Sequence, residues 1–150
     1  MIELLSPAGS PEGVIAAVQN GADAVYMGMG DFNARRGAKN FTDEEFVKAV
    51  RYCHVRGCKV YVTLNTLVND REMHDAVAAA KIASDAGADG LIVQDLGMSY
   101  AIRCALPDIP LHASTQMSLH NLAGVEAAAE MGMTRAVLAR ELSFEQIRFI

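Results

Sequence analysis

Residues 111–121 read LHASTQMSLHN, and the alternation at the start of this stretch decides the fold class. Apolar Leu111 and Ala113 are interleaved with polar residues. Because successive side chains of a β-strand point to opposite faces, the pattern predicts a strand with one apolar face and one face of hydrogen-bonding groups. Such a strand either faces a ligand inside a barrel or faces water at a sheet edge. The polar residues are His112, Ser114 and Gln116.

Six short β-rich runs, including this one, recur along the chain, and alanine-rich segments of helical period separate them. Glycine follows these segments at Gly21, Gly57, Gly87 and Gly132, as is usual where a helix ends in the left-handed conformation. Strict alternation predicts a parallel sheet with right-handed crossovers. The predicted strands are Ile2–Leu5, Ala24–Met27, Lys59–Leu64, Gly90–Val93, Leu111–Ala113 and Ala136–Leu138.

Two helix starts carry their own signals. The segment EEFVKAVRYCHVR is predicted to be a helix capped by Thr42 or Asp43, because short polar side chains accept hydrogen bonds from the free backbone N–H groups of a first turn. The sixth and last helix is predicted to begin near Ser143. The apolar face predicted for the first of these two helices consists of Phe46, Val47 and Val50.

The strand faces select among the parallel-sheet folds. Strands of a doubly wound sheet are covered by helices on both faces and are apolar on both. Here the second face becomes polar toward the C-terminal end of the strands, as at Asn65, Gln94 and Arg140. We therefore predict an α/β fold, a parallel (β/α) barrel of the TIM type with ligand-contacting groups at its C-terminal rim. A closed barrel has eight units and about 250 residues, so residues 1–150 are expected to form a single partial barrel domain of six units, the N-terminal part of a longer protein.

Composition limits the function. The chain has 150 residues, 51% of them hydrophobic, and a net charge of −5. This charge argues against a broad, non-specific nucleic-acid surface, although it does not exclude a local basic patch. The N-terminus lacks the features of a signal peptide, and no run reaches the roughly 18 apolar residues of a membrane span. We therefore expect a cytoplasmic protein without a membrane span.

The cysteines favour neither disulfides nor a metal. An odd number of cysteines without a secretory signal argues against a disulfide framework. Cys53 and Cys58 are separated by four residues and lack a second ligand pair, so we interpret them as thiols rather than zinc ligands. Cys104 lies at helical spacing in YAIRCAL and is expected in the core. We expect no metal site and no cofactor in this chain.

Several motifs together resemble one known family. The stretches LLSPAGSPEGVIAAVQNGADAVYMG, FNARRGAKNF, VYVTLNTLVND, LIVQDLGM, LHASTQMSLHN and AVLARELSFEQI are similar, in order and spacing, to the collagenase-like peptidase family, peptidase family U-thirty-two. The resemblance covers essentially the whole chain. It implies the N-terminal, barrel-like catalytic domain of an enzyme from a family named for proteolysis. It also implies relatives that hydroxylate RNA bases or ubiquinone with an iron–sulfur cluster, with prephenate as a co-substrate in the RNA group.

The resemblance places the cluster-binding cysteines after the ARELS motif and beyond residue 150. It therefore implies an iron–sulfur cluster for the full-length protein only, and it implies that the 150 residues alone are inactive. Peptide hydrolysis is not supported by the residues themselves. His112 and Ser114 are two apart on one strand without an identifiable acidic partner, and the chain has no His-Glu-x-x-His motif.

Two cationic features could hold an anion. The loop DFNARRGAKN is long for its place between a strand and a helix, and Arg35 could contact a phosphate or a carboxylate there. The guanidinium of Arg140 could bind a carboxylate through two hydrogen bonds, or it could form a salt bridge within the chain. The partners for that salt bridge would be Glu141, Asp95 or Glu3.

The whole polar set suits recognition of a small polar or anionic ligand. Three functions stay open: modification of an RNA base or a quinone by the full-length protein, proteolysis, and a binding or assembly module without catalysis. Two open sheet edges would be templates for pairing, so we expect a homo-oligomer. The predicted catalytic residues are His112, Ser114 and Gln116, and the predicted ligand-binding residues are Asn65, Gln94, Arg140, Arg35 and Asn40.

Overall fold

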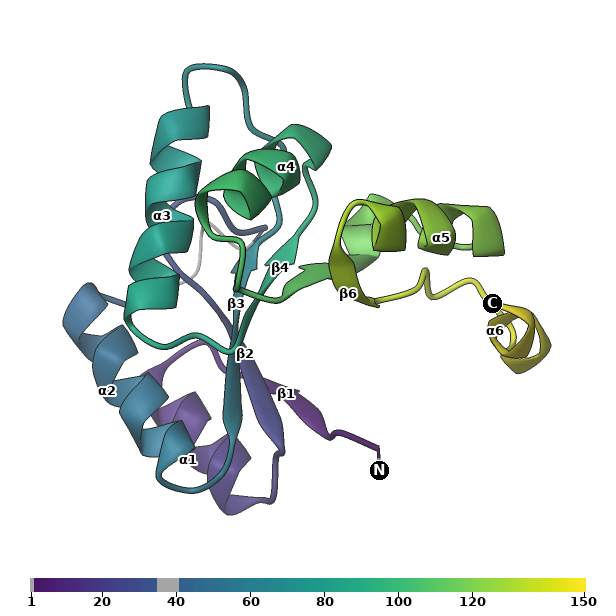
Figure 1. Cartoon of the computed structure of the whole chain (residues 1–150). Coiled ribbons are helices and arrows are strands. Elements are labelled where there is room, and N and C mark those ends of the chain that lie inside the picture. The colour runs from purple at the N-terminus through teal and green to yellow at the C-terminus, as the bar shows by residue number, and fades with distance from the viewer. Residues whose placement is uncertain (1, 35–40) are drawn as a thin grey trace.

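Strands and helices alternate along the chain in a computed structural model that describes residues 2–34 and 41–150 (Figure 1). A single-turn 3-10 helix, η1 (Thr115–Met117), interrupts this alternation after the fifth strand. The strands are β1 (Leu5–Pro7), β2 (Ala24–Gly28), β3 (Lys59–Leu64), β4 (Gly90–Val93), β5 (Leu111–Ala113) and β6 (Met133–Ala136). The helices are α1 (Pro11–Gln19), α2 (Asp43–His54), α3 (Met73–Asp85), α4 (Leu96–Ala105), α5 (Leu122–Glu130) and α6 (Phe144–Phe149).

The strands form one parallel sheet in the order β1-β2-β3-β4-β5-β6. Each strand therefore pairs with the next strand of the sequence, and β1 and β6 lie at the two ends of the sheet. The first four helices pack along the outer face of the sheet, whereas α5 and α6 extend to one side (Figure 1). The predicted α/β fold of the (β/α) barrel type is confirmed, with six parallel strands in sequential order.

Two predicted strands were misplaced. The first strand begins at Leu5 and not at Ile2. Leu4 does not pair with a strand, because its N–H donates to the carboxylate of Asp23 in the turn before β2 at 2.7 Å. The sixth begins at Met133, directly after the helix-ending Gly132, and ends at Ala136, where it was predicted to begin. The pairing of β5 with β6 shifts register between Leu111 and His112 of β5, and this irregularity leaves Thr134 of β6 without a paired residue.

Helix α2 begins where the sequence predicted. Thr42 is its N-cap, and a capping box joins the Thr42 and Glu45 side chains to each other's backbone N–H groups. The prediction of its apolar face was wrong at one position. Phe46 and Val50 are buried, but Val47 is 51% exposed. Consecutive residues of a helix are about 100° apart, so Phe46 and Val47 cannot both point at the sheet.

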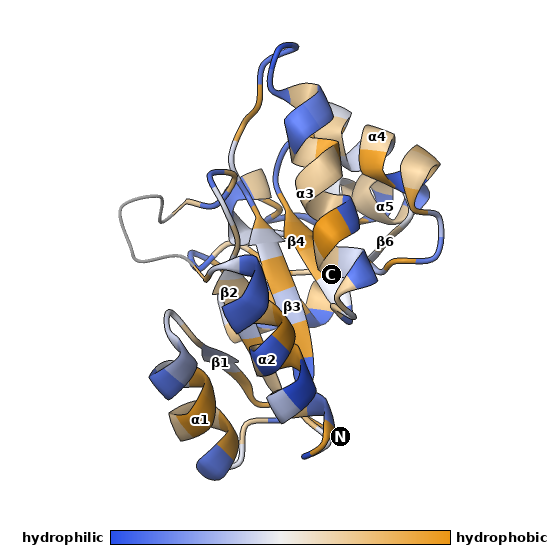
Figure 2. Ribbon diagram, turned by 90° about the vertical axis from the view of Figure 1, so that its left-hand side faces the viewer, coloured by the Kyte–Doolittle hydropathy of each residue, from blue (hydrophilic) through white to orange (hydrophobic). Residues whose placement is uncertain are grey.

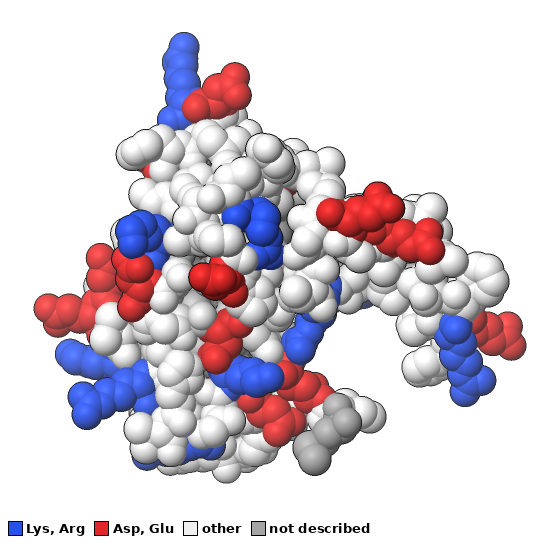
Figure 3. Space-filling view, viewed as in Figure 1, with Lys and Arg blue, Asp and Glu red and all other residues white. Residues whose placement is uncertain are grey.

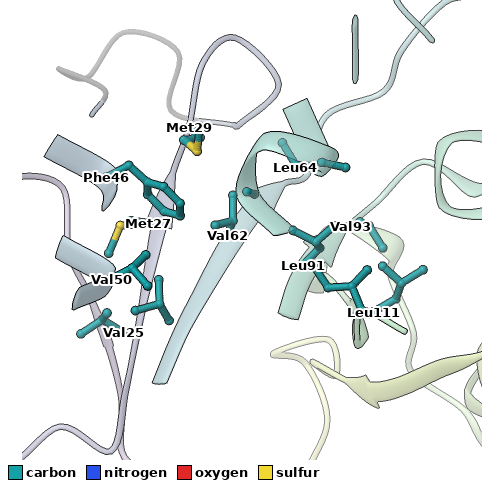
Figure 4. Packing of buried hydrophobic residues seen from close by; sticks show 14 of the residues in the cluster. Val25, Met27, Met29, Phe46, Val50, Val62, Leu64, Leu91, Val93 and Leu111 are labelled. Carbon is teal, nitrogen blue, oxygen red and sulfur yellow. The ribbon is translucent and has the colours of Figure 1, made fainter. Parts of the chain in front are cut away.

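The main core lies between the sheet and the helices that cover it. Val60, Val62 and Leu64 of β3 point into this layer and are fully buried. In Figure 2, hydrophobic and less hydrophobic bands alternate along β3. Figure 4 shows Phe46 of α2 beside Met27 of β2 within this layer. A second, smaller cluster contains Ala24, Tyr61 and Ile92 and occupies the opposite, inner face of the sheet.

Charged residues meet on the inner face near the start of the strands. Glu3 accepts a hydrogen bond from Arg135 Nη1 at 2.6 Å, and the Tyr61 hydroxyl lies 3.1 Å from each oxygen of the same carboxylate. Lys59 Nζ lies 3.4 Å from it. The bond from Arg135 lowers the pKa of Glu3, while burial raises the pKa of Tyr61. We call Glu3, Tyr61 and Arg135 the inner cluster, and it joins the two ends of the sheet.

Within residues 2–34 and 41–150, no helix is both long and apolar enough to cross a membrane. Cys53 and Cys58 are buried free thiols. Cys104 was expected in the core but is exposed, because the buried face of α4 is formed by Met98, Ser99 and Ile102.

Candidate functional site

A cavity of about 340 Å³ opens on the inner side of the sheet, at the carboxyl ends of the strands. This is the rim at which (β/α) barrels bind their ligands. Its walls are mostly apolar, and its polar groups are amides and hydroxyls. The polar lining residues are Asn33, Thr63, Asn65, Ser114, Thr115 and Gln116, and the apolar ones include Leu5, Tyr26, Met27, Phe41, Ile92 and Val137.

Ser114 and Gln116 reach this cavity through a turn at the end of β5. The N–H of Ser114 donates to the Val93 carbonyl at 2.8 Å, which continues the strand pairing by one residue. The Ser114 hydroxyl then caps η1 by accepting a hydrogen bond from the N–H of Gln116 at 3.3 Å. Ser114 is consequently buried and fixed, whereas the Gln116 side chain stands exposed at the rim. The structure brings both predicted residues into the cavity wall.

Asn65 links two separate parts of the wall. Its Oδ1 accepts a hydrogen bond from the N–H of Ala34 at 3.1 Å, and its Nδ2 lies 3.5 Å from the Ser114 hydroxyl. The residue follows β3, so one side chain connects the segment after β2 with the end of β5. An amide suits this position because it donates and accepts at the same time. Asn65 therefore lines the cavity, as predicted, and also holds its shape.

Asn33 is a polar wall residue that the sequence patterns did not identify. Its side chain is only 2% exposed, and Nδ2 donates to the Gly30 carbonyl at 2.8 Å. It packs directly against Gly28, where a Cβ atom would lie 2.7 Å from the Asn33 side chain. The signal that could have found it is the glycine at the end of β2, which leaves room for a side chain to return across the strand.

His112 points into the barrel but lies beneath the cavity rather than in its wall. It is 4% exposed, and its ring meets the Tyr61 ring edge-on at a centroid distance of 4.7 Å. Gly90 makes room for it, since a Cβ atom there would lie 3.3 Å from the imidazole. Burial, and then the neighbouring Arg135 cation, lower the pKa of His112 to about 4. The ring is neutral at pH 7, so it is a poor anion ligand.

The other predicted ligand-binding residues do not line this cavity. Gln94 is half-buried outside its wall. Arg140 lies in a second, adjacent cavity. Among the described residues, Arg140 forms none of the predicted salt bridges; Glu3 pairs with Arg135, and Asp95 caps α4 through the Met98 N–H at 2.7 Å. The predicted residues Arg35 and Asn40 lie outside the described residues.

This arrangement favours binding of a neutral polar group over hydrolysis. No described residue in the cavity wall is charged, and none is a histidine. Ser114 therefore has neither a base nor an acid beside it in the wall, as an acyl-transfer site requires. Within residues 2–34 and 41–150, no three His, Cys, Asp or Glu side chains are grouped to hold a metal ion.

Comparison with known proteins gives related sequences along the chain. The sequence model of peptidase family U32 matches residues 9–150. The 23S rRNA 5-hydroxycytidine synthase of Escherichia coli (strain K12) is 40% identical over 149 residues, which are 99% of this chain and 22% of that protein. The tRNA hydroxylation protein P1 of Bacillus subtilis (strain 168) is 40% identical over 97% of this chain and 35% of that protein.

Protease names also occur among the relatives. A collagenase of Porphyromonas gingivalis (strain ATCC BAA-308 / W83) is 34% identical over 99% of this chain and 35% of that protein. The chain thus spans 22% to 35% of the length of these curated relatives.

Among solved structures, a U32 peptidase superposes with a TM-score of 0.75 at 14% identity, over 92% of this chain and 58% of that chain. An aldolase superposes with a TM-score of 0.67 at 19% identity, over 90% of this chain and 67% of that chain. These two likenesses concern the fold alone.

Proposed function

The chain belongs to peptidase family U32, and from this membership we propose that its cavity binds a pyrimidine base of RNA that the full-length protein hydroxylates. One relative is named for hydroxylated cytidine in rRNA, and another is named for tRNA hydroxylation. This chain covers about a third or less of the length of each. The single observation that carries the proposal is the chemical character of the cavity wall.

An RNA base is flat, uncharged and rimmed by hydrogen-bond donors and acceptors. Enzymes that modify a base take it out of its stack, enclose it between aromatic or apolar side chains and read its edge by hydrogen bonds. The cavity offers the matching groups: Tyr26 and Phe41 among its apolar walls, and the amides of Asn65 and Gln116 among its polar ones. A cavity of about 340 Å³ is large enough for a single base but not for a folded segment of RNA.

Proteolysis has weaker support, although a relative is named collagenase. A peptidase needs an activated nucleophile or a metal-bound water. Among the described hydroxyl groups of the cavity wall, only that of Ser114 belongs to a predicted catalytic residue, and its Oγ already accepts a hydrogen bond from the Gln116 N–H. The described residues thus favour binding over peptide hydrolysis.

Hydroxylation replaces a C–H bond of the base by a C–OH group, and it needs an oxygen donor and an acceptor for electrons. The described residues do not fit an iron–sulfur cluster, because no group of ligands is assembled among them. We propose that any such cluster is held by the rest of a longer protein in which residues 1–150 form the partial barrel. We also propose the cytoplasm as the place of action, because RNA is the proposed substrate.

Gln116→Ala is expected to weaken cytidine binding by the 150-residue chain five- to tenfold, with the free energy of unfolding unchanged. Loss of one hydrogen bond to the base costs about 1 kcal/mol, which corresponds to this factor. NMR titration with cytidine measures the dissociation constant. Gln19→Ala is the matched control, because Gln19 is exposed at the end of α1 and is not part of the wall. Equal affinities of the Gln116→Ala variant and the wild type would contradict the assignment.

The same proposal is tested in cells by mass spectrometry of nucleosides from total RNA. A strain lacking the full-length protein should lose a hydroxylated pyrimidine, and the wild-type gene should restore it. Unchanged hydroxypyrimidine levels in the deletion strain would reject RNA hydroxylation. Cytidine binding combined with unchanged levels would favour a binding module without catalysis.

We further propose that the chain associates with a second copy of itself. The apolar side chains of Ile2, Leu4, Phe144 and Phe149 are mostly exposed, and β1 and β6 each lack a strand partner on one side among the described residues. Exposed edges and apolar patches of this kind favour association. Light scattering at micromolar concentration is expected to give about twice the 16.1 kDa mass of one chain. A single species of monomer mass would refute association.

A further inference from the structure

A second cavity, of about 460 Å³, lies beside the first one on the same rim. Thr115 lines both cavities, so they are neighbours with one residue as the shared wall. The two differ in charge: the first has no charged group in its described wall, whereas the second contains a guanidinium and a carboxylate. The lining residues of the second cavity are Thr115, Ser118, His120, Ala139, Arg140, Glu141, Leu142 and Gln146.

Two chain segments are tied together to make this second cavity. The N–H of Ala139 donates to the Leu119 carbonyl at 2.8 Å, which places the segment after β6 against the segment after η1. The bond joins the immediate neighbours of Arg140 and His120, so these two side chains are carried on adjoining backbone. Ser118, which lines this cavity, adopts a left-handed conformation with φ of 58°, which is uncommon for a residue other than glycine.

Arg140 carries a charge that the described residues do not neutralise. Arg135 pairs with Glu3, and Arg103 donates to three backbone carbonyls at 2.7 to 3.1 Å, so these two guanidinium groups are engaged within the chain. Arg140 is exposed, lines a cavity and has neither an ion pair nor a hydrogen bond among the described residues. A guanidinium with its donor fork available fits a phosphate through two parallel hydrogen bonds.

The same cavity also contains hydrogen-bond acceptors. His120 Nδ1 lies 2.8 Å from the Ser118 carbonyl, and because a carbonyl can only accept, Nδ1 carries the proton. In this tautomer Nε2 is an acceptor, and the Glu141 carboxylate is another. A carboxylate repels a phosphate, so its presence calls for a ligand that also brings hydroxyl donors. Ribose hydroxyls are such donors, and the 2′-hydroxyl is the group by which proteins distinguish RNA from DNA.

We propose that the second cavity binds the ribose–phosphate of the nucleotide whose base enters the first cavity. Arg140 contacts the phosphate, and His120 and Glu141 accept hydrogen bonds from the ribose hydroxyls. The inference rests on the proposed function, since it requires the base to enter the first cavity. It adds a sugar–phosphate subsite with its own residues. Figure 3 shows a hollow between the body of the molecule and the arm formed by α5 and α6.

Binding of cytidine and of cytidine monophosphate by the 150-residue chain separates the two cavities. We expect the wild type to bind the monophosphate about tenfold more tightly than cytidine. Arg140→Ala should remove this difference without changing the affinity for cytidine, and Arg140→Lys should restore part of it. Arg148→Ala is the control, because Arg148 is exposed on α6 and lines neither cavity. Glu141→Gln should reduce the preference for the ribonucleotide over the deoxyribonucleotide.

The outcomes distinguish this inference from the proposed function. Absence of cytidine binding by the wild type would reject the base site and this subsite with it. Two results would reject the subsite alone. One is a wild type that binds cytidine and cytidine monophosphate equally tightly, and the other is an Arg140→Ala variant that still binds the monophosphate about tenfold more tightly than cytidine. Malonate that binds at Arg140 as tightly as the monophosphate would reassign the cavity to a free small anion and overturn the inference.

Discussion

Phe46→Ala is expected to lower the free energy of unfolding by about 4 kcal/mol, the usual range for truncating a fully buried phenylalanine. Phe46 is 0% exposed and belongs to the core cluster with Met27 of β2 and Val50 of its own helix. Its removal leaves a cavity between α2 and the sheet, because the surrounding strands are fixed by their pairing on both sides. Urea denaturation followed by circular dichroism measures the change.

Val47→Ala is the matched control for this prediction. Val47 is the next residue of the same helix and is 51% exposed, so its truncation should change the free energy of unfolding by no more than about 0.5 kcal/mol. The contrast between two adjacent apolar residues isolates packing from helix propensity. Equal effects of the two substitutions would show that α2 does not pack on the sheet through Phe46.

Acidification from pH 7 to pH 5 is expected to lower the free energy of unfolding by about 2 kcal/mol through His112, and by about 3 kcal/mol at pH 4. The pKa of His112 is about 4 in the folded chain, against a reference of 6.5. Between these values the unfolded chain binds a proton that the folded chain does not. The contribution of His112 to the free energy of unfolding is therefore fully present above about pH 6.5, and it is lost as the pH falls toward 4. Urea denaturation at a series of pH values measures the slope.

His112→Asn should remove most of this slope, although truncation of a buried ring lowers stability at every pH. His74→Asn is the control: the His74 side chain is 93% exposed on α3, so its replacement should leave the slope unchanged. A wild-type curve that is flat between pH 7 and pH 5 would show that the His112 imidazole is accessible to protons. Below about pH 4.5, protonation of Glu3 adds to the loss, because its pKa is also lowered in the folded chain.

The sequence predicted most of the fold because local signals and the tertiary structure agree. The predicted bounds of β3, β4 and β5 are those of the structure, since glycine or proline flanks each apolar run. The sixth strand was misplaced by three residues, because its register against β5 is irregular. A bulge reverses the alternation of faces along a strand, and alternation was the signal from which the strand was predicted.

The site was predictable only where it follows strand alternation. Asn65 and Ser114 line the cavity because they continue the inner faces of β3 and β5. His112 has the same direction but lies one layer deeper, and a sequence pattern gives the face of a residue without its depth. Asn33 was missed for another reason. Its position depends on how the loop after β2 returns across the strand, and such a return leaves no periodic signal.

The ion pair between Glu3 and Arg135 also bears on the order in which the structure assembles. Every strand pairing joins neighbours in the sequence, so each βαβ unit closes a short loop and the sheet can grow one unit at a time. Glu3 and Arg135 are 132 residues apart, and closing so long a loop costs about 1.5 kcal/mol more in conformational entropy than closing one βαβ unit. Much of this entropy is already lost when the sheet forms, because the curvature of the sheet brings its first and last strands together. We therefore expect the inner cluster to be the last contact that forms during folding, after pairings that are otherwise local.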